Sequence, residues 1–212
     1  SGVLVDEHWT NQLSTPGFLG RDEDLRVHLE ALSLSVVRGR HFMLDGQPGV
    51  GKSVFIRRLL GEAFNSWRIS HEPALQNSRF LFCSSEDFVG TEDESRTKIE
   101  NLYSFLQSRP ELVPVFDQFE QVMNSSLGLH ASFVSTFGSW IQSTGRPCVF
   151  VIRTDAANHE MLRQIPRHAL RELPSDATRQ IVLNRLPEYL RAGGSAFELL
   201  EDAEKFCTEL IG

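Results

Sequence analysis

The chain has 212 residues, of which 41% are hydrophobic and 23% are charged. This length accommodates one α/β domain with a small appendage, and the composition excludes disordered and fibrous chains. The formal net charge of −7 argues against a protein that binds nucleic acid mainly through a basic face. No apolar run approaches the roughly 18 residues of a membrane-spanning helix. We interpret the opening Ser-Gly as the start of a piece cut from a longer protein.

Continuous and periodic apolar patterns alternate along the chain. Continuous apolar runs predict buried strands at 40–45, 79–83, 112–116 and 148–152, with a fifth within 168–173. Helical spacing predicts helices over 21–37, 53–64, 92–108, 174–190 and 197–210, and around 133–141. Thr91 and Glu94 form a capping-box pattern at the start of the helix over 92–108.

This alternation of strands and helices predicts the fold class. Strands that are apolar throughout are typical of a parallel sheet covered on both faces. We therefore expect an α/β domain with a parallel five-stranded sheet between helices over residues 1–174. Residues 175–212 are expected to form a short, partial helical lid.

The cysteine pattern indicates the compartment. Cys83, Cys148 and Cys207 are widely spaced and form no CxxC pair. This arrangement favours buried thiols in a reducing compartment, so we expect a cytoplasmic protein. The seven histidines show no metal-ligand spacing either.

A phosphate-binding loop is the most specific motif. The segment fits G-x-x-x-x-G-K-[S/T] and consists of Gly46, Gln47, Pro48, Gly49, Val50, Gly51, Lys52 and Ser53. Glycines let backbone N–H groups surround phosphates at a helix N-terminus. Lys52 is predicted to reach the β- and γ-phosphates, and the Ser53 hydroxyl to bind Mg²⁺. The alternative is a glycine-rich turn without a ligand.

A second acidic position follows the strand at 112–116. Asp117 is predicted to meet Mg²⁺ through water; the alternative is an ordinary strand-ending aspartate at a turn. Pro114 removes a backbone donor within this strand. Glu120 is a conceivable substitute for Gln118, because residues i and i+2 share a face if the strand continues that far, but it would lie too far along to be the first choice.

These motifs together resemble those of AAA+ ATPases, a class of P-loop NTPase, over residues 17–200. The likeness is strongest to the first nucleotide-binding domain of Clp-type unfoldases and disaggregases. Residues 18–23 resemble the family's opening motif, which implies that Gly20 and Arg21 lie beside the adenine. Residues 46–53 and 115–118 resemble its phosphate loop and its second acidic motif.

The resemblance also implies a sensor and an arginine finger. Thr154 occupies the place of the polar sensor, although a strand-end hydroxyl is the alternative. Arg163 and Arg167, just before the fifth strand, lie where the family places an arginine finger for the neighbouring subunit. An unrelated surface arginine is the alternative for each.

The sequence departs from the family at two functional positions. Gln118 stands where many such ATPases carry the glutamate that polarises the attacking water, and an amide cannot accept that proton. Residues 90–94 are acidic and lack the aromatic residue of the pore loop, which grips a threaded polypeptide.

The resemblance implies an ATP-binding AAA+ module that uses Mg²⁺. We expect it to assemble with itself or related AAA+ subunits in a ring or filament and to remodel or scaffold a protein partner. Hydrolysis is expected to be slow or absent because of Gln118. The alternatives are a non-hydrolysing scaffold, an origin-recognition or helicase-loader protein acting on DNA, and a nucleotide-dependent signalling switch of the apoptotic-ATPase kind.

Overall fold

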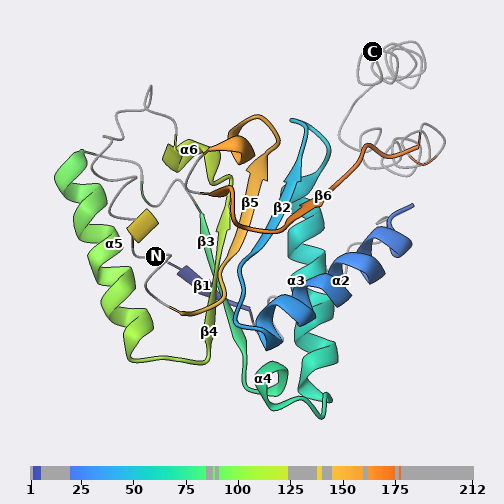
Figure 1. Cartoon of the computed structure of the whole chain (residues 1–212), viewed down its shortest axis with the longest axis horizontal. Coiled ribbons are helices and arrows are strands. Elements are labelled where there is room, and N and C mark those ends of the chain that lie inside the picture. Colours follow the sequence, from blue (N-terminus) through green and yellow to red (C-terminus); the bar gives the residue numbers. More distant parts are fainter. Residues whose placement is uncertain are drawn as a thin grey trace, which may run out of the picture.

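A six-stranded sheet of order β1-β3-β4-β5-β2-β6 forms the centre of the molecule (Figure 1). The computed structural model describes residues 2–5, 20–84, 88, 91–123, 138–139, 145–159, 162–174 and 177. The strands are β1 (Gly2–Leu4), β2 (Phe42–Gly46), β3 (Arg79–Ser84), β4 (Leu112–Asp117), β5 (Val149–Arg153) and β6 (Arg167–Ala169). The helices are α2 (Asp22–Val37), α3 (Lys52–Arg68), α4 (Pro73–Gln76), α5 (Glu92–Gln107) and α6 (Glu120–Met123), with a 3₁₀ turn η3 (Ala156–Asn158).

Five of the six strands run parallel, which confirms the predicted parallel five-stranded sheet. The sixth strand, β1, pairs antiparallel with β3, so that Val3 lies opposite Phe82. Three residues are too few for periodicity to mark a strand, so the sequence did not predict β1. The fifth parallel strand, β6, begins at Arg167, one residue before its predicted range.

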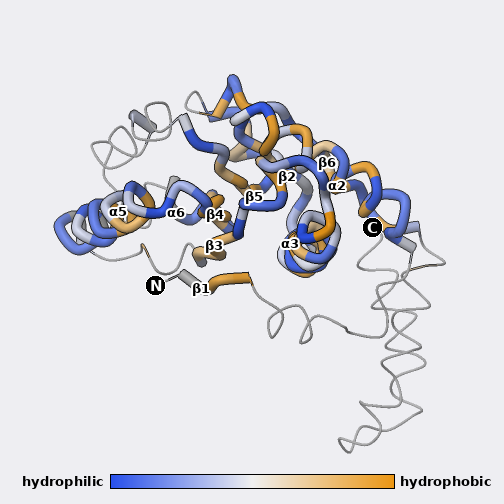
Figure 2. Tube along the Cα trace, turned by 90° about the horizontal axis from the view of Figure 1, so that it is seen from below, coloured by the Kyte–Doolittle hydropathy of each residue, from blue (hydrophilic) through white to orange (hydrophobic). Residues whose placement is uncertain are grey.

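Helices cover both faces of the sheet and bury two apolar clusters. Helices α2 and α3 supply Leu32, Phe55 and Leu59 to the cluster on one face. Helix α5 supplies Ile99 and Leu106 to the cluster on the other face. Figure 2 shows hydrophobic residues along β3 and β4, while much of the surrounding helices is hydrophilic. The strands are apolar throughout because both of their faces are buried.

The start of α5 shows the predicted capping box. Thr91 Oγ1 accepts from the backbone N–H of Glu94 over 3.3 Å, and the Thr91 N–H donates to the Glu94 carboxylate over 2.9 Å. The acidic residues after Thr91 therefore form the first turn of α5. Phe88, just upstream, is buried with its ring centroid 6.1 Å from that of Phe116.

Pro114 is accommodated within β4. It lies opposite Leu81 of β3, and the pairing of β4 with β5 starts one residue later, at Val115. The missing backbone donor therefore precedes the ladder between β4 and β5.

Two predicted regions lie outside the described residues. The helix around 133–141 has only Gly138 and Ser139 described, and the lid over 175–212 has only Ala177. In the part of the chain that is described, no helix has the length and apolar character needed to cross a bilayer.

Candidate nucleotide-binding site

The carboxyl ends of three neighbouring parallel strands bring the predicted site residues together. Gly46 ends β2, Asp117 ends β4, and Arg153 ends β5 in register with Gly46. The backbone N–H of Thr154 donates to the carbonyl of Gly46 over 3.2 Å. Ligands of open parallel sheets bind at this edge, where connections leave in opposite directions. The loop, the acidic residue and the sensor position therefore share one edge of the sheet.

The backbone of the phosphate loop depends on glycine at two positions. Gly49 and Gly51 have φ angles of +80° and +88°, in the left-handed region that side chains disfavour. An added Cβ at either position would meet nothing within 4 Å, so conformation rather than space requires glycine. Gly51 is also the N-cap of α3, which begins at Lys52. The unpaired N–H groups of the first turn of α3 lie next to the loop, as an anion site requires.

The ammonium of Lys52 lies against the loop. Its Nζ donates to the carbonyl of Gly46 over 2.8 Å and to that of Gln47 over 2.9 Å. Burial lowers the pKa of Lys52, and the carboxylates of Glu120 and Asp117 oppose this lowering. A cation is thus held at the place where the motif requires one for the phosphates.

Ser53 and Asp117 meet although 64 residues separate them. Ser53 Oγ donates to Asp117 Oδ1 over 3.1 Å, and the N–H of Gln118 donates to the same oxygen over 3.0 Å. Burial raises the pKa of Asp117, and both hydrogen bonds partly offset that rise. A hydroxyl and a carboxylate side by side are hard oxygen ligands of the kind that Mg²⁺ prefers. The residues present therefore fit a magnesium ion.

The chain turns sharply after Asp117. Gln118 has a φ of +54°, is exposed, and accepts a hydrogen bond from the side-chain amide of Gln121. The strand therefore ends at Asp117, and the turn leads directly into α6, where Glu120 is half-buried. Sequence reasoning kept Glu120 as a conceivable substitute only on a continuing strand, and did not prefer it because it would then lie too far along. The left-handed conformation of a non-glycine residue was the feature that the sequence did not reveal.

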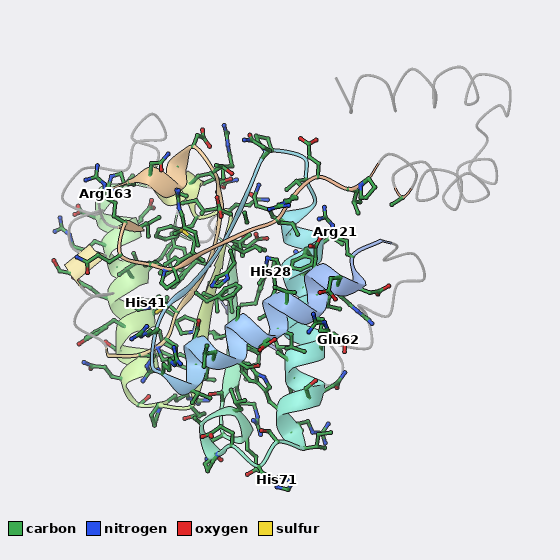
Figure 3. The ribbon with its side chains drawn as sticks, turned by 45° about the vertical axis from the view of Figure 1, so that its right-hand side comes forward. Arg21, His28, His41, Glu62, His71 and Arg163 are labelled. Atoms are coloured by element: carbon green, nitrogen blue, oxygen red, sulfur yellow. The ribbon has the colours of Figure 1, made fainter. Side chains whose placement is uncertain are left out.

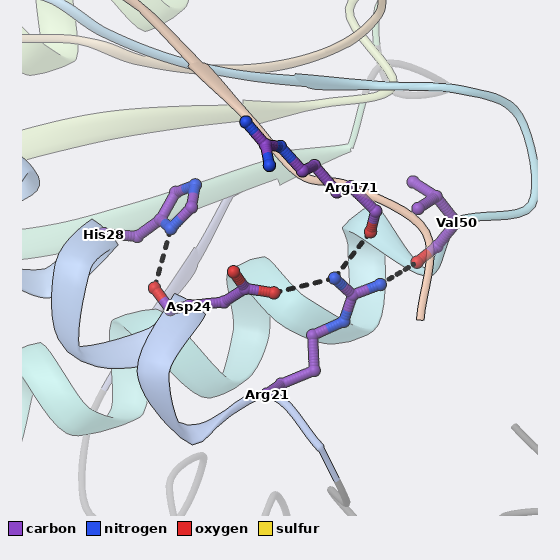
Figure 4. Close-up of polar contacts among 5 residues, drawn as sticks. All are labelled: Arg21, Asp24, His28, Val50 and Arg171. Atoms are coloured by element: carbon purple, nitrogen blue, oxygen red, sulfur yellow. Dashed lines mark hydrogen bonds and ion pairs between the residues drawn. The ribbon is translucent and has the colours of Figure 1, made fainter. Parts of the chain in front are cut away.

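Arg21 connects the phosphate loop to two other segments (Figure 4). Its guanidinium donates to the Val50 carbonyl over 3.1 Å, to the Arg171 carbonyl over 2.6 Å and to the Asp24 carboxylate over 2.9 Å. The side chain is 5% exposed. The resemblance implied a place beside the adenine, whereas the guanidinium is directed at these oxygens. Arg21 therefore holds the phosphate loop through the carbonyl of Val50.

The two candidate finger arginines differ in their surroundings. Both are exposed, and Figure 3 shows Arg163 on the opposite side of the molecule from Arg21. Arg167 is the first residue of β6, not a residue before it, and its guanidinium donates to the Asn158 side chain over 3.1 Å. The prediction that Arg167 precedes the strand is therefore wrong, because β6 starts earlier than the apolar run.

Solved structures resemble this fold. Hsp104 of S. cerevisiae in an ADP complex gives a TM-score of 0.64 at 13% identity, covering 88% of this chain and 33% of that chain. The S. cerevisiae Hsp104:casein complex in its extended conformation gives 0.62 at 14% identity, covering 89% and 33%. A chain of the E. coli MS115-1 HORMA:CdnC:Trip13 complex gives 0.63 at 12% identity, covering 88% and 74%.

The chain has the AAA+ fold. Hsp104 and Trip13 are AAA+ ATPases, and the likeness agrees with the resemblance to a Clp-type unfoldase domain. This chain spans about a third of the length of each Hsp104 chain. No protein-family model and no curated protein sequence matches this chain.

Proposed function

We propose that this chain is an ATP-binding AAA+ module that uses Mg²⁺. The observation that carries the proposal is the contact between Ser53 and Asp117 beside the Lys52 ammonium. This arrangement joins a phosphate-binding cation to a pair of magnesium ligands at one edge of the sheet. The Hsp104 relatives were solved with ADP and with ATPγS, which supports nucleotide binding here.

The module assembles with copies of itself or with related AAA+ subunits and remodels or scaffolds a protein partner. Support comes from the relatives, whose structures contain casein in one case and HORMA and CdnC in another. The exposed Arg163 supports assembly, because an arginine finger has to reach a neighbouring subunit. The widely spaced cysteines, which form no CxxC pair, support a cytoplasmic location.

Hydrolysis is slow or absent in this proposal. Gln118 offers an amide where a carboxylate is usual, and its oxygen is occupied by the side chain of Gln121. An amide does not accept a proton from water. Residue 118 therefore supplies no general base.

A scaffold or signalling switch is the second candidate. Residues 92–94 belong to the capped first turn of α5, and the nearby aromatic Phe88 is buried against Phe116. Neither is placed to grip a threaded polypeptide. The net charge of −7 argues against the DNA-loading alternative.

Nucleotide binding is tested by the thermal midpoint. Mg·ATP at about 100 times its Kd should stabilise the folded chain by about 2.7 kcal/mol. Lys52→Ala should abolish this shift, because it removes the cation at the phosphates. Lys98→Ala, an exposed lysine on α5, is the matched control and should keep the full shift. An unchanged shift in Lys52→Ala would contradict the proposal.

A further inference from the structure

Glu120 has a carboxylate oxygen that the fold does not use. Its Oε2 is buried and has no hydrogen-bond partner. An unpaired buried carboxylate oxygen is costly, and native proteins keep such atoms where a ligand or water meets them. Burial raises the pKa of Glu120, while the backbone N–H groups of Glu120 and Arg153 lower it. The carboxylate therefore keeps one buried oxygen that can receive a proton or a water.

The position of Glu120 connects it to the phosphate loop. Arg153 lies in register with Gly46, whose carbonyl accepts from Lys52 Nζ over 2.8 Å. Among the carboxylates that raise the pKa of Lys52, Glu120 has a larger effect than Asp117 or Asp155. The Phe119 N–H donates to the Val151 carbonyl over 2.9 Å and fixes the start of α6 against β5. Glu120 is thus held next to the carboxyl end of β5, whose last residue lies in register with the first residue of the phosphate loop.

The resemblance places residue 118 in the site, but the structure exposes Gln118 and partly buries Glu120. Gln118 is exposed and accepts a hydrogen bond from Gln121, whereas Glu120 is half-buried. The left-handed conformation at Gln118 causes this difference, because it ends the strand and turns the following residues back toward β5.

We infer that Glu120 is the general base for the residual ATP hydrolysis of this site. The inference rests on the proposed ATP-binding function. Glu120 accepts the proton of a water whose oxygen bonds to the γ-phosphorus. The bond from that phosphorus to the β–γ bridging oxygen breaks, and its electron pair leaves with ADP. Phosphate is the other product, and the proton passes on to solvent.

The first arm of the test measures turnover of radiolabelled ATP under single-turnover conditions in the full chain. Glu120→Gln keeps the shape of the side chain and should slow turnover at least about 10²-fold, the low end of a general-base contribution. Glu100→Gln, at an exposed glutamate on α5, is the matched control, and its rate should stay within about threefold of wild type. The thermal midpoint without nucleotide verifies that both variants fold.

The second arm measures binding without turnover. A carboxylate beside the γ-phosphate repels ATP more than ADP, so Glu120→Gln should raise the affinity for ATP relative to ADP by at least about threefold. Glu100→Gln should leave this ratio unchanged. An unchanged ratio in Glu120→Gln would overturn the inference.

The outcomes separate the inference from the proposed function. A wild-type chain that does not bind Mg·ATP overturns both. A chain that binds Mg·ATP but does not hydrolyse it, or that hydrolyses it equally well as Glu120→Gln, overturns the assignment of Glu120 alone. Slow turnover that disappears in Glu120→Gln and persists in Glu100→Gln supports it.

Discussion

Asp117 is subject to two opposing requirements. Burial at the end of β4 favours its neutral form and raises its pKa, whereas a magnesium ligand has to be ionised. Hydrogen bonds from Ser53 and from the Gln118 N–H hold the carboxylate in place. In the ligand-free protein, burial therefore opposes the ionisation of this carboxyl.

Asp117→Asn should stabilise the ligand-free chain. The amide oxygen can keep both hydrogen bonds, and the cost of burying a charge disappears. We expect the thermal midpoint at neutral pH to rise by about 2–4 °C, the shift that about 1 kcal/mol produces in a chain of this size. The Mg²⁺-dependent part of the ATP-induced shift should be lost.

The pH dependence follows from the same residue. Because the folded pKa of Asp117 lies above its unfolded value, stability should fall as pH rises from the unfolded pKa to the folded pKa. Asp117→Asn should remove this fall. Asp155→Asn, which changes an exposed carboxylate, should raise the thermal midpoint neither at neutral pH nor at high pH. A lower midpoint in Asp117→Asn would show that ionised Asp117 stabilises the fold.

Arg21 joins three elements that are remote in the sequence. It connects the start of α2, the phosphate loop and the segment after β6, which lies 150 residues away along the chain. The planar guanidinium serves three oxygens at once. His28, one turn further along α2, donates from Nδ1 to the Asp24 carbonyl and packs edge-on against Phe55 of α3. The first turns of α2 are thereby fixed beneath the loop.

Arg21→Lys should be strongly destabilising although it conserves charge. An ammonium cannot reproduce the planar fork, so buried carbonyls lose their donors. We expect the free energy of unfolding to fall by about 2 kcal/mol, measured by urea denaturation. The affinity for ATP should also fall, because the Val50 carbonyl is no longer held.

Arg26→Lys is the matched control on the same helix. Arg26 is exposed and pairs with Glu23 over 2.6 Å at spacing i, i+3. Such a surface pair contributes about 0–1 kcal/mol, so its replacement by lysine should change little. Equal effects of the two substitutions would contradict the role assigned to Arg21.

The molecule exposes two arginines close together in the sequence at β6. Arg167 begins β6, Arg163 precedes it, and Arg163 is on the opposite side from Arg21 (Figure 3). An exposed cation is accessible to a neighbouring chain. It suits a site on a neighbouring AAA+ subunit, as the proposed assembly requires.

Assembly should depend on nucleotide. Light scattering should show an average mass that rises with protein concentration in Mg·ATP and stays monomeric without it. Lys52→Ala should remain monomeric in both conditions. A mass that stays monomeric at every concentration of wild-type chain would contradict self-assembly and leave related subunits as the partners to test.

Local patterns in the sequence predicted much of this molecule. The phosphate loop is specified within eight residues, because glycines at positions such as 49 and 51 permit the conformation that the loop needs. The parallel strands are recognisable because burial on both faces leaves apolar runs. The capping box at Thr91 and Glu94 was predicted because its two residues lie within one helical turn of each other in the sequence.

Other features arise from contacts between distant segments, so no local pattern contains them. The pairing of β1 with β3 joins residues about 80 positions apart, and β1 is too short to be visible alone. The partners of Arg21 lie on two other segments. The environment of Glu120 depends on one left-handed residue and on the neighbouring end of β5. The sequence indicates which residues can bind phosphate, whereas the fold buries part of Glu120 and exposes Gln118, because the chain turns as β4 ends.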